Sequence, residues 1–175
     1  MSGEQHPSAT VIRRTLRAND RGPIERLLGS TGFFNPEELE VAMELVDDRL
    51  LEGEQSHYRF LVAEHGSRVA GYACWGPIPG TRESVDLYWI AVDPAFQGRG
   101  VGRELLTAAE RWIAEAGRRR VWVETAGRPQ YRPTRDFYLA CGYRVAAELE
   151  GYYAPGDDKV VFLKVLGGAE GSGLD

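Results

Sequence analysis

The stretch Gln97-Gly98-Arg99-Gly100-Val101-Gly102 decides the fold of this chain. The apolar run Leu87–Val92 precedes it and reads as a buried strand, and a helical pattern from Arg103 to Ala116 follows. Glycines let the backbone approach a ligand closely, and the first N–H groups of a helix have no partner within it. A strand that enters a glycine-rich turn and then a helix therefore predicts a site for a phosphate or pyrophosphate.

Two common phosphate loops do not fit the spacing of these glycines. A dinucleotide-binding turn has the pattern G-x-G-x-x-G, and the third glycine position falls on Arg103. A Walker A loop also needs glycine at that position, followed by lysine and then serine or threonine, and the chain has none of these there. The pattern that fits is Q-x-x-G-x-G, formed by Gln97, Gly100 and Gly102.

This pattern resembles the acetyl-CoA loop of the GNAT superfamily of N-acyltransferases. The flanking sequence YWIAVDPAFQGRGVGRELL and the later TRDFYLACGYRV strengthen the resemblance, which covers roughly Thr10 to Leu166. It implies an α/β (α+β) fold, with a mixed, mostly antiparallel twisted sheet of about seven strands, four helices and splayed central strands. It also implies an enzyme that moves an acetyl group from acetyl-CoA to a primary amine.

The length of 175 residues predicts one domain, over residues 10–166, between flexible tails at 1–9 and 167–175. Hydrophobic residues make up 43% and charged residues 27%, which is ordinary for a globular protein. The formal net charge is −5, so the chain lacks the general basic character of a nucleic-acid-binding protein. A monomer or a homodimer is expected.

No apolar run approaches the roughly 18 residues of a membrane span, and the polar N-terminus has no signal-peptide core. A cytoplasmic protein without a membrane partner is therefore expected. The two cysteines, Cys74 and Cys141, are too few for a disulfide framework. The histidines show no metal-ligand spacing with each other or with cysteine, so no metal is expected.

Capping and breaking residues predict the helices in the first half of the chain. Asn19-Asp20 offers an N-cap for a first helix, which Gly29 and Gly32 break. Asn35-Pro36-Glu37-Glu38 begins a second, amphipathic helix, with asparagine as the cap, proline first and glutamate third, and Gly53 ends it. The predicted order is strand, two helices, three strands, helix, strand, helix and two strands.

The end of the chain is predicted as a pair of strands joined by a long loop. The two strands are expected at Tyr143–Leu149 and Lys159–Leu166. The loop between them holds Tyr152 and Tyr153 and reaches the acceptor in the family's fold, as the resemblance implies. Asp157-Asp158, in the same loop before Lys159, either binds an ammonium group of the acceptor or makes a simple turn after Pro155-Gly156.

The resemblance places the cofactor along the central strand and its loop. The strand backbone pairs with the pantetheine arm and sets an N–H near the thioester carbonyl, where it stabilises the oxyanion. Loop N–H groups bind the pyrophosphate, and the two arginines beside them add positive charge. These residues are Ile90, Ala91, Val92, Gln97, Gly98, Arg99, Gly100, Val101, Gly102 and Arg103.

The short helix near the end of the chain departs from the family pattern. Many members have an asparagine and then an alanine before a Phe-Tyr pair, whereas this chain has Tyr131 and Thr134 there. The usual asparagine contact to the cofactor is then replaced by Tyr131, Thr134 or Arg135. The Phe-Tyr pair itself is present, and the resemblance makes Tyr138 the acid that protonates the departing thiolate. A core tyrosine whose hydroxyl binds the backbone is the alternative.

The attacking amine must lose a proton to a base, directly or through water. Asp86, at the start of the central strand, and Glu124, near the end of the next strand, are the two candidates. Both positions are also explained as surface carboxylates at strand ends. The acidic stretch 37–54 either attracts a cationic amine or forms a solvated helix face.

The sequence thus predicts an acetyl-CoA-dependent N-acetyltransferase whose acceptor is a small amine or amino acid. Acetylation of a protein N-terminus or of lysine is the alternative within the same chemistry. A domain that binds acyl-CoA without catalysis, as a sensor or a partner module, is the alternative from another class.

Overall fold

The computed structural model describes residues 9–167 of the chain. Its helices and strands follow the predicted order. The helices are α1 Arg21–Thr31, α2 Pro36–Glu52, α3 Val101–Glu115 and α4 Arg132–Ala140. The strands are β1 Thr10–Arg13, β2 Arg59–His65, β3 Arg68–Pro77, β4 Ser84–Val92, β5 Arg120–Ala126, β6 Arg144–Ala154 and β7 Asp157–Val165.

The seven strands form one sheet in the order β1-β2-β3-β4-β5-β7-β6. β4 and β5 pair in parallel, and the pairs β1–β2, β2–β3, β5–β7 and β6–β7 are antiparallel. The register of β4 with β5 runs over Ser84–Asp86, which lie opposite Arg120, Val121 and Trp122. A mixed, mostly antiparallel sheet of seven strands with four helices is therefore confirmed.

The chain forms two compact units. The first consists of the residues as far as Trp75 together with Trp89–Ala109, and the second of Gly76–Tyr88 and the residues from Glu110 onward. β4 and α3 each contribute to both units. The single domain over 10–166 stays a prediction, and the predicted tails lie outside the described residues except for Ala9 and Gly167.

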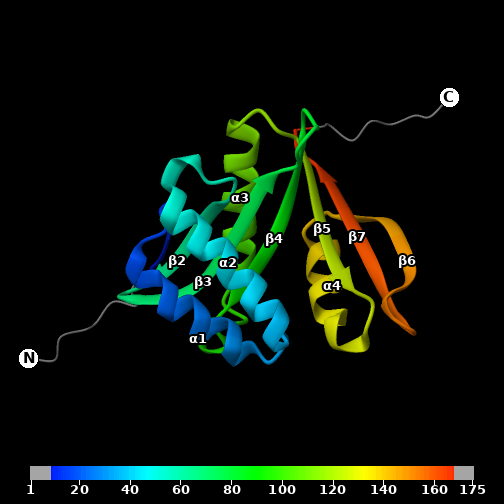
Figure 1. The fold of residues 1–175 in the computed structure, drawn as a ribbon, viewed down its shortest axis with the longest axis horizontal. Coiled ribbons are helices and arrows are strands. Elements are labelled where there is room, and N and C mark those ends of the chain that lie inside the picture. The colour runs from blue at the N-terminus through cyan, green and yellow to red at the C-terminus, as the bar shows by residue number, and fades with distance from the viewer. Residues whose placement is uncertain (1–8, 168–175) are drawn as a thin grey trace, which may run out of the picture. The chain divides into compact units, whose positions relative to one another are not determined.

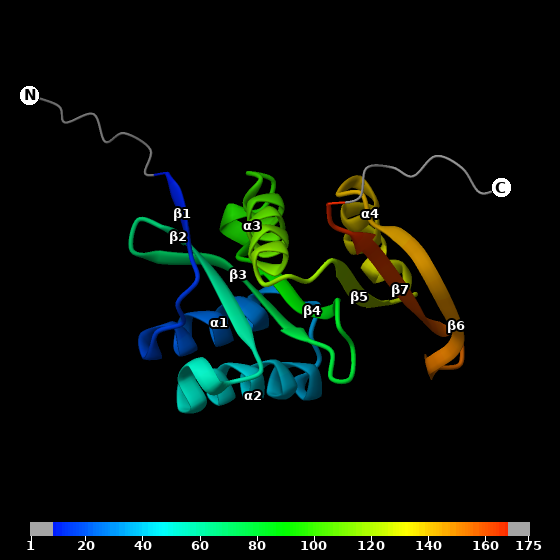
Figure 2. The same cartoon turned by 90° about the horizontal axis from the view of Figure 1, so that it is seen from above.

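In the first unit, helices cover both faces of β2 and β3. Figure 2 shows α1 and α2 on one side of these strands and α3 on the other. Side chains from all of these elements meet in the core, where the rings of Phe60 and Tyr72 stack with centroids 6.1 Å apart. Each fully buried side chain of this size contributes about 1.5–3 kcal/mol to folding. Fully buried side chains of this core include Ile24, Leu28, Val46, Leu61, Val62 and Leu105.

The start of α2 has the predicted capping box. The Glu38 N–H donates to Asn35 Oδ1 at 2.8 Å, and the Asn35 N–H donates to Glu38 Oε2 at 2.9 Å. These two bonds satisfy backbone groups that have no partner inside the helix. α2 ends at Gly53, which has a φ of 56°. Both predicted ends of α2 are therefore confirmed.

The predicted break of α1 at Gly29 is wrong. The helix continues through Gly29 to Thr31 and ends at Gly32, whose φ is 70°. Leu27 and Leu28 are buried in the core just before Gly29. A glycine inside a helix costs only about 1 kcal/mol relative to alanine, so the burial of these two leucines outweighs it.

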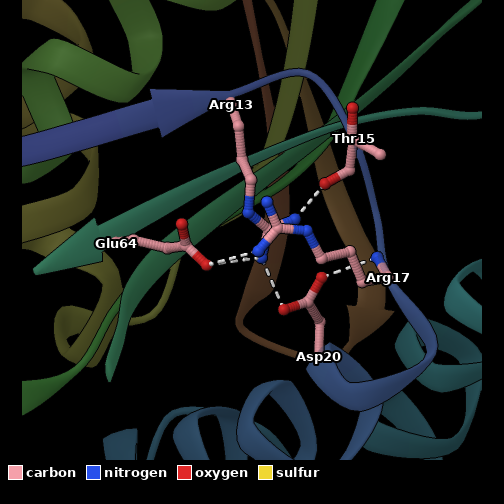
Figure 3. Close-up of polar contacts among 5 residues, drawn as sticks. All are labelled: Arg13, Thr15, Arg17, Asp20 and Glu64. Carbon is pink, nitrogen blue, oxygen red and sulfur yellow. Dashed lines mark hydrogen bonds and ion pairs between the residues drawn. The ribbon is translucent and has the colours of Figure 1, made fainter. Parts of the chain in front are cut away.

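Asp20 precedes α1, but its side chain makes no capping hydrogen bond to this helix, so the predicted cap is wrong. Asp20 instead belongs to a cluster with Arg13, Thr15, Arg17 and Glu64, here called the Arg13 cluster (Figure 3). Arg13 Nη2 lies 2.5 Å from Asp20 Oδ1 and 3.1 Å from Glu64 Oε1, and Arg13 also donates to the Thr15 carbonyl. The Arg17 N–H donates to Asp20 Oδ2 at 2.7 Å. Burial alone lowers the pKa of Arg13, but its two carboxylate partners outweigh this and raise it. The cluster fastens β1 to β2 and to the start of α1.

In the second unit, β5, β7 and β6 lie side by side (Figure 1). β5 pairs with β7 from Arg120 opposite Val165 to Ala126 opposite Lys159. The predicted long loop before β7 is wrong, because Tyr152 and Tyr153 lie within β6. The hairpin closes at Pro155-Gly156, and the register between β6 and β7 is irregular between Leu149 and Ala154.

Candidate active site

In the first unit, β4 ends at Val92 and leads into the predicted anion loop. The Asp93 N–H donates to the Ala70 carbonyl at 2.9 Å, which holds the end of β4 against β3. Asp93 Oδ1 accepts the Ala95 N–H at 2.8 Å and caps a short 3₁₀ turn over Pro94–Phe96, which the sequence patterns missed. Gln97 Nε2 donates to the Val92 carbonyl at 3.1 Å. The Gln97 side chain thereby closes the loop onto the end of β4.

Two glycines of the loop adopt backbone angles that favour glycine. Gly98 has a φ of 72° and Gly100 a φ of 84°. These φ values favour glycine because other residues are strained in this conformation. A Cβ added at either position would meet no atom within 4 Å, so the space beside the loop is open. The Glu104 N–H donates to the Gly100 carbonyl at 3.0 Å, and this bond begins the helical pattern of α3.

The first turn of α3 directs N–H groups toward the loop. Val101, Gly102 and Arg103 precede the first helical bond, so no carbonyl within α3 accepts their N–H groups. Such a helix start favours an anion through these donors and through the helix dipole. The loop and this turn together have the form of a phosphate-binding turn.

Positive charge gathers beside the loop around the buried ring of Phe96. The guanidinium carbon of Arg68 lies 5.1 Å from the centroid of this ring, and that of Arg99 lies 5.6 Å from it. Arg68 Nη2 also lies 3.6 Å from Asp93 Oδ2. Arg103 is exposed on the first turn of α3. Arginines placed like this suit a phosphate ligand through charge and paired N–H donors.

Gly71, in β3, is a positioning residue that the motif analysis missed. A Cβ at Gly71 would lie 2.8 Å from the Ala91 carbonyl oxygen and 3.0 Å from Leu105 Cδ1. Only glycine therefore lets the end of β4 and the helix α3 approach β3 this closely. A glycine inside a strand pattern is a known sign of close backbone approach, so the sequence held this signal.

A pair of aromatic side chains lies beside β4 in the first unit. Phe34, in the loop between α1 and α2, packs edge-on against Trp89 of β4, with ring centroids 5.1 Å apart and an interplanar angle of 70°. Both rings are half-buried. An apolar, aromatic surface of this kind next to a strand end suits part of an acceptor pocket.

Several acidic residues of α2 already have partners. Asp47 accepts from Arg21 at 2.6 and 2.9 Å, and this hydrogen bond lowers the pKa of Asp47. Asp48 Oδ1 accepts from the buried Ser56 hydroxyl at 2.5 Å. Exposed acidic residues on the same helix include Glu37, Glu40, Glu44 and Glu52. The exposed carboxylates fit both explanations of the acidic stretch, the attraction of a cationic amine and a solvated helix face.

Tyr138 lies in α4 of the second unit and is 3% exposed. Its ring centroid lies 5.3 Å from that of Phe137, 5.4 Å from that of Tyr143 and 5.9 Å from that of Phe162. Burial raises the pKa of the Tyr138 hydroxyl well above its ordinary value. An ordinary tyrosine hydroxyl is already protonated at neutral pH, so the raised pKa does not supply the proton and makes this hydroxyl a weaker acid.

The two predicted bases have different surroundings. Asp86 is half-buried in β4, opposite Trp122 of β5. Glu124 is exposed in β5, and its Oε2 lies 2.6 Å from Lys159 Nζ. Burial alone lowers the pKa of Lys159, but the hydrogen bond and charge of Glu124 outweigh this and raise it. Glu124 is thus held in an ion pair.

The residues that stand in place of the family asparagine lie around the start of α4. Arg135 Nη1 donates to the carbonyls of Ala126 at 2.8 Å and Arg128 at 3.0 Å, so this nitrogen fastens α4 to the end of β5. The guanidinium of Arg128 lies 5.3 Å from the ring centroid of Tyr131. Thr134 is half-buried in the first turn of α4. Contacts of these residues with the cofactor stay a prediction.

The predicted residues divide between the two units. Ile90–Arg103 lie in the first unit, where strand, loop and helix turn are continuous. Asp86, Glu124 and Tyr138 lie in the second unit, as do the three residues at the start of α4. Over residues 9–167, no group of three or more His, Cys, Asp or Glu side chains is arranged to hold a metal ion. Among the helices described, none is long and apolar enough to cross a membrane.

Comparisons with known proteins identify the family. The model of the acetyltransferase (GNAT) family matches residues 26–143. The crystal structure of an assigned GNAT-family acetyltransferase from Desulfovibrio desulfuricans is 42% identical, with a TM-score of 0.88 over 90% of this chain and 99% of that chain. The chain belongs to the GNAT acetyltransferase family.

More distant structures share the fold. The ribosomal-protein-S18-alanine N-acetyltransferase of Escherichia coli is 20% identical, with a TM-score of 0.72 over 95% of this chain and 99% of that one. The PaiA N-acetyltransferase of Thermoplasma acidophilum, in complex with coenzyme A, is 17% identical, with a TM-score of 0.71 over 90% of this chain and 99% of that chain. Curated protein sequences give no match. As a family member, the chain is an acyltransferase whose general reaction is acetyl-CoA-dependent N-acetylation.

Proposed function

We propose that this enzyme acetylates a small primary amine or an amino acid by direct attack of the amine on the thioester of acetyl-CoA. The loop carries this proposal, because Gly98 and Gly100 hold it open and the first turn of α3 supplies N–H donors for a pyrophosphate. The half-buried pair Phe34 and Trp89 supports a small acceptor, since aromatic faces attract an ammonium group. The exposed carboxylates of α2 support a cationic one.

In the proposed reaction, the amine nitrogen forms a bond to the thioester carbon and the carbon–sulfur bond breaks. N–H groups of the backbone at Ile90–Val92 hold the oxyanion that develops. The proton of the amine goes to one of the two carboxylates, half-buried Asp86 in β4 or exposed Glu124 in β5, directly or through water. Tyr138 gives its proton to the departing thiolate.

The cofactor has two further sets of proposed contacts. The N–H groups of Gly98–Gly102 bind the pyrophosphate, and Arg99 and Arg103 add charge beside it. Tyr131 and Thr134 take the place of the family asparagine at the start of α4. Arg135 supports them, since its Nη1 fastens α4 to the end of β5. Gln97 shapes the loop through its bond to the Val92 carbonyl.

An acceptor screen tests the proposal. The protein is incubated with acetyl-CoA and either small amines, amino acids or peptides, and free thiol and the mass of the product are followed. Saturable thiol release with a small amine or amino acid is expected. Release with peptides alone would overturn the proposed acceptor class, and tight acetyl-CoA binding without release on any amine would overturn the reaction. A reaction without acceptor corrects for protein thiols, of which Cys74 is buried with a raised pKa.

Replacing Gly100 by alanine is expected to weaken acetyl-CoA binding about tenfold, because a left-handed φ costs a non-glycine residue roughly 1–2 kcal/mol and the free loop relaxes to a conformation that does not bind. The added methyl group also enters the open space beside the loop. Isothermal titration with acetyl-CoA measures the effect. Gly80→Ala is the matched control, since Gly80 has a φ of 77° and open space beside it in an exposed turn. An equal loss of affinity in both variants would contradict the assignment of the loop.

Replacing Tyr138 by phenylalanine is expected to lower kcat about 100-fold, as the loss of a general acid does. The KM for acetyl-CoA should change little, because the ring and its packing remain. Steady-state thiol release at saturating acceptor measures the effect, and near-ultraviolet circular dichroism checks the packing of the core. An unchanged kcat would remove Tyr138 from the proposed mechanism.

A further inference from the structure

Glu110, Tyr143 and Lys164 form a hydrogen-bonded network in the second unit, here called the Glu110 clamp. The Tyr143 hydroxyl donates to Glu110 Oε1 at 3.0 Å. Lys164 Nζ donates to both carboxylate oxygens of Glu110, at 3.0 and 2.8 Å. The same ammonium group donates to the Cys141 carbonyl at 2.9 Å, at the end of α4. The clamp thus joins α3, β7 and the segment after α4.

The clamp contacts Tyr138 through both its ring and its backbone. The ring of Tyr143 packs edge-on against that of Tyr138, with centroids 5.4 Å apart and an angle of 65°. The N–H groups of Cys141 and Tyr143 both donate to the Tyr138 carbonyl, at 3.1 and 3.0 Å. Tyr143 and Cys141 are therefore both in direct contact with Tyr138.

We propose that the Glu110 clamp is a positioning device that fixes the hydroxyl of Tyr138 for proton donation to the thiolate. The inference rests on the proposed role of Tyr138 in the reaction. Tyr143 is the positioning residue in direct contact with Tyr138, and Glu110 and Lys164 hold Tyr143.

The chemistry of the clamp exceeds what packing alone requires. Tyr143 is 3% exposed and the side chain of Glu110 is 14% exposed. In the folded protein, water therefore solvates these polar groups only slightly. Apolar residues of similar volume often serve a protein core as well as a buried ion pair. A hydrogen-bonded aromatic ring, in contrast, has a fixed position and angle, and a misplacement of about 1 Å at a reacting group costs up to roughly 100-fold in rate.

Tyr143→Phe tests the clamp, because it removes the hydroxyl and keeps the ring. A kcat lowered about tenfold is expected, with little change in the KM for acetyl-CoA, since geometry rather than binding is disturbed. Tyr72→Phe is the matched control. Tyr72 is fully buried, and its hydroxyl has no hydrogen-bond partner within the described part of the chain. The Tyr72→Phe variant should therefore have the kcat of the wild type.

A double-mutant cycle separates positioning from a general loss of stability. In a Tyr138→Phe background, Tyr143→Phe should lower kcat no further, because the hydroxyl that it positions is already absent. An equal loss in both backgrounds would overturn the clamp and leave the proposed function standing. A wild-type kcat in Tyr138→Phe itself would overturn both the clamp and the role of Tyr138, while thiol release by the wild type would still establish the acetyl transfer.

Lys164 provides a second pair of variants. Lys164→Arg keeps a cation and several N–H donors beside Glu110, and its kcat should stay within about threefold of the wild type. Lys164→Met keeps the length of the side chain and removes the charge, and its kcat should fall about as far as in Tyr143→Phe. The clamp is overturned if both variants, folded as judged by circular dichroism, have the wild-type kcat.

Discussion

Asp20→Ala is expected to lower the free energy of unfolding by about 3 kcal/mol, the lower end of the range for breaking a buried ion pair. Asp20 is 4% exposed, and its carboxylate accepts from Arg13 at 2.5 Å and from the Arg17 N–H at 2.7 Å. Its removal leaves the guanidinium of Arg13, itself little exposed, with Glu64 as its remaining carboxylate partner. It also frees the start of α1 from β1.

Denaturant unfolding, followed by far-ultraviolet circular dichroism, measures this loss. Asp47→Ala is the matched control, because Asp47 pairs with Arg21 at a similar distance of 2.6 Å but on an exposed surface. Exposed ion pairs contribute little to the free energy of unfolding, so the control should have a denaturant midpoint close to that of the wild type. Equal midpoints for the two variants would contradict the idea that the Arg13 cluster fastens β1 to the core.

The sequence predicted those parts of the fold that depend on neighbouring residues. The capping box of Asn35 and Glu38 and the stop at Gly53 are local signals, and both ends of α2 were therefore predicted correctly. Gly29 failed as a helix break because the burial of Leu27 and Leu28, a tertiary effect, outweighs its local cost. Asp20 failed as a cap for the same reason, since its partner Arg13 comes from another element.

The candidate site shows the same division. The spacing of Gly98 and Gly100 was sufficient to predict a turn with a backbone that favours glycine, because backbone conformation is a local property, and anion binding by this turn stays a prediction. Side-chain partners from distant strands could not be predicted from the sequence. The ion pair of Glu124 with Lys159, for example, forms only when β5 and β7 pair. Tyr152 was misplaced in a loop for a related reason, because β6 continues through an irregular stretch after Leu149 and pairs with β7 again at Ala154.

Gly71→Val is expected to lower the free energy of unfolding by about 3 kcal/mol, at the upper end for overpacking in a core. The Cβ of any residue here would lie 2.8 Å from the Ala91 carbonyl oxygen and 3.0 Å from Leu105 Cδ1. The first of these contacts is with backbone, which cannot rotate away as a side chain does. β4 must therefore move away from β3.

The same substitution is expected to weaken acetyl-CoA binding more than 100-fold by titration calorimetry, or about 2.7 kcal/mol. The Val92 carbonyl receives the bond from Gln97 that closes the loop, so a displaced β4 carries the loop with it. Gly71→Ala should give a smaller loss of both stability and affinity, because it adds the Cβ without the two further methyl groups.

Gly29→Ala is the control for the loss of a glycine, since a Cβ there meets no atom within 4 Å and the residue lies inside α1. It should stabilise the protein by up to about 1 kcal/mol and leave acetyl-CoA binding unchanged. Suppose instead that Gly71→Val loses stability but binds acetyl-CoA as the wild type does. The loop would then hold its shape without the close packing of β3 on β4, and its own glycines would suffice. Loss of both properties together shows that one strand glycine sets the position of the anion turn.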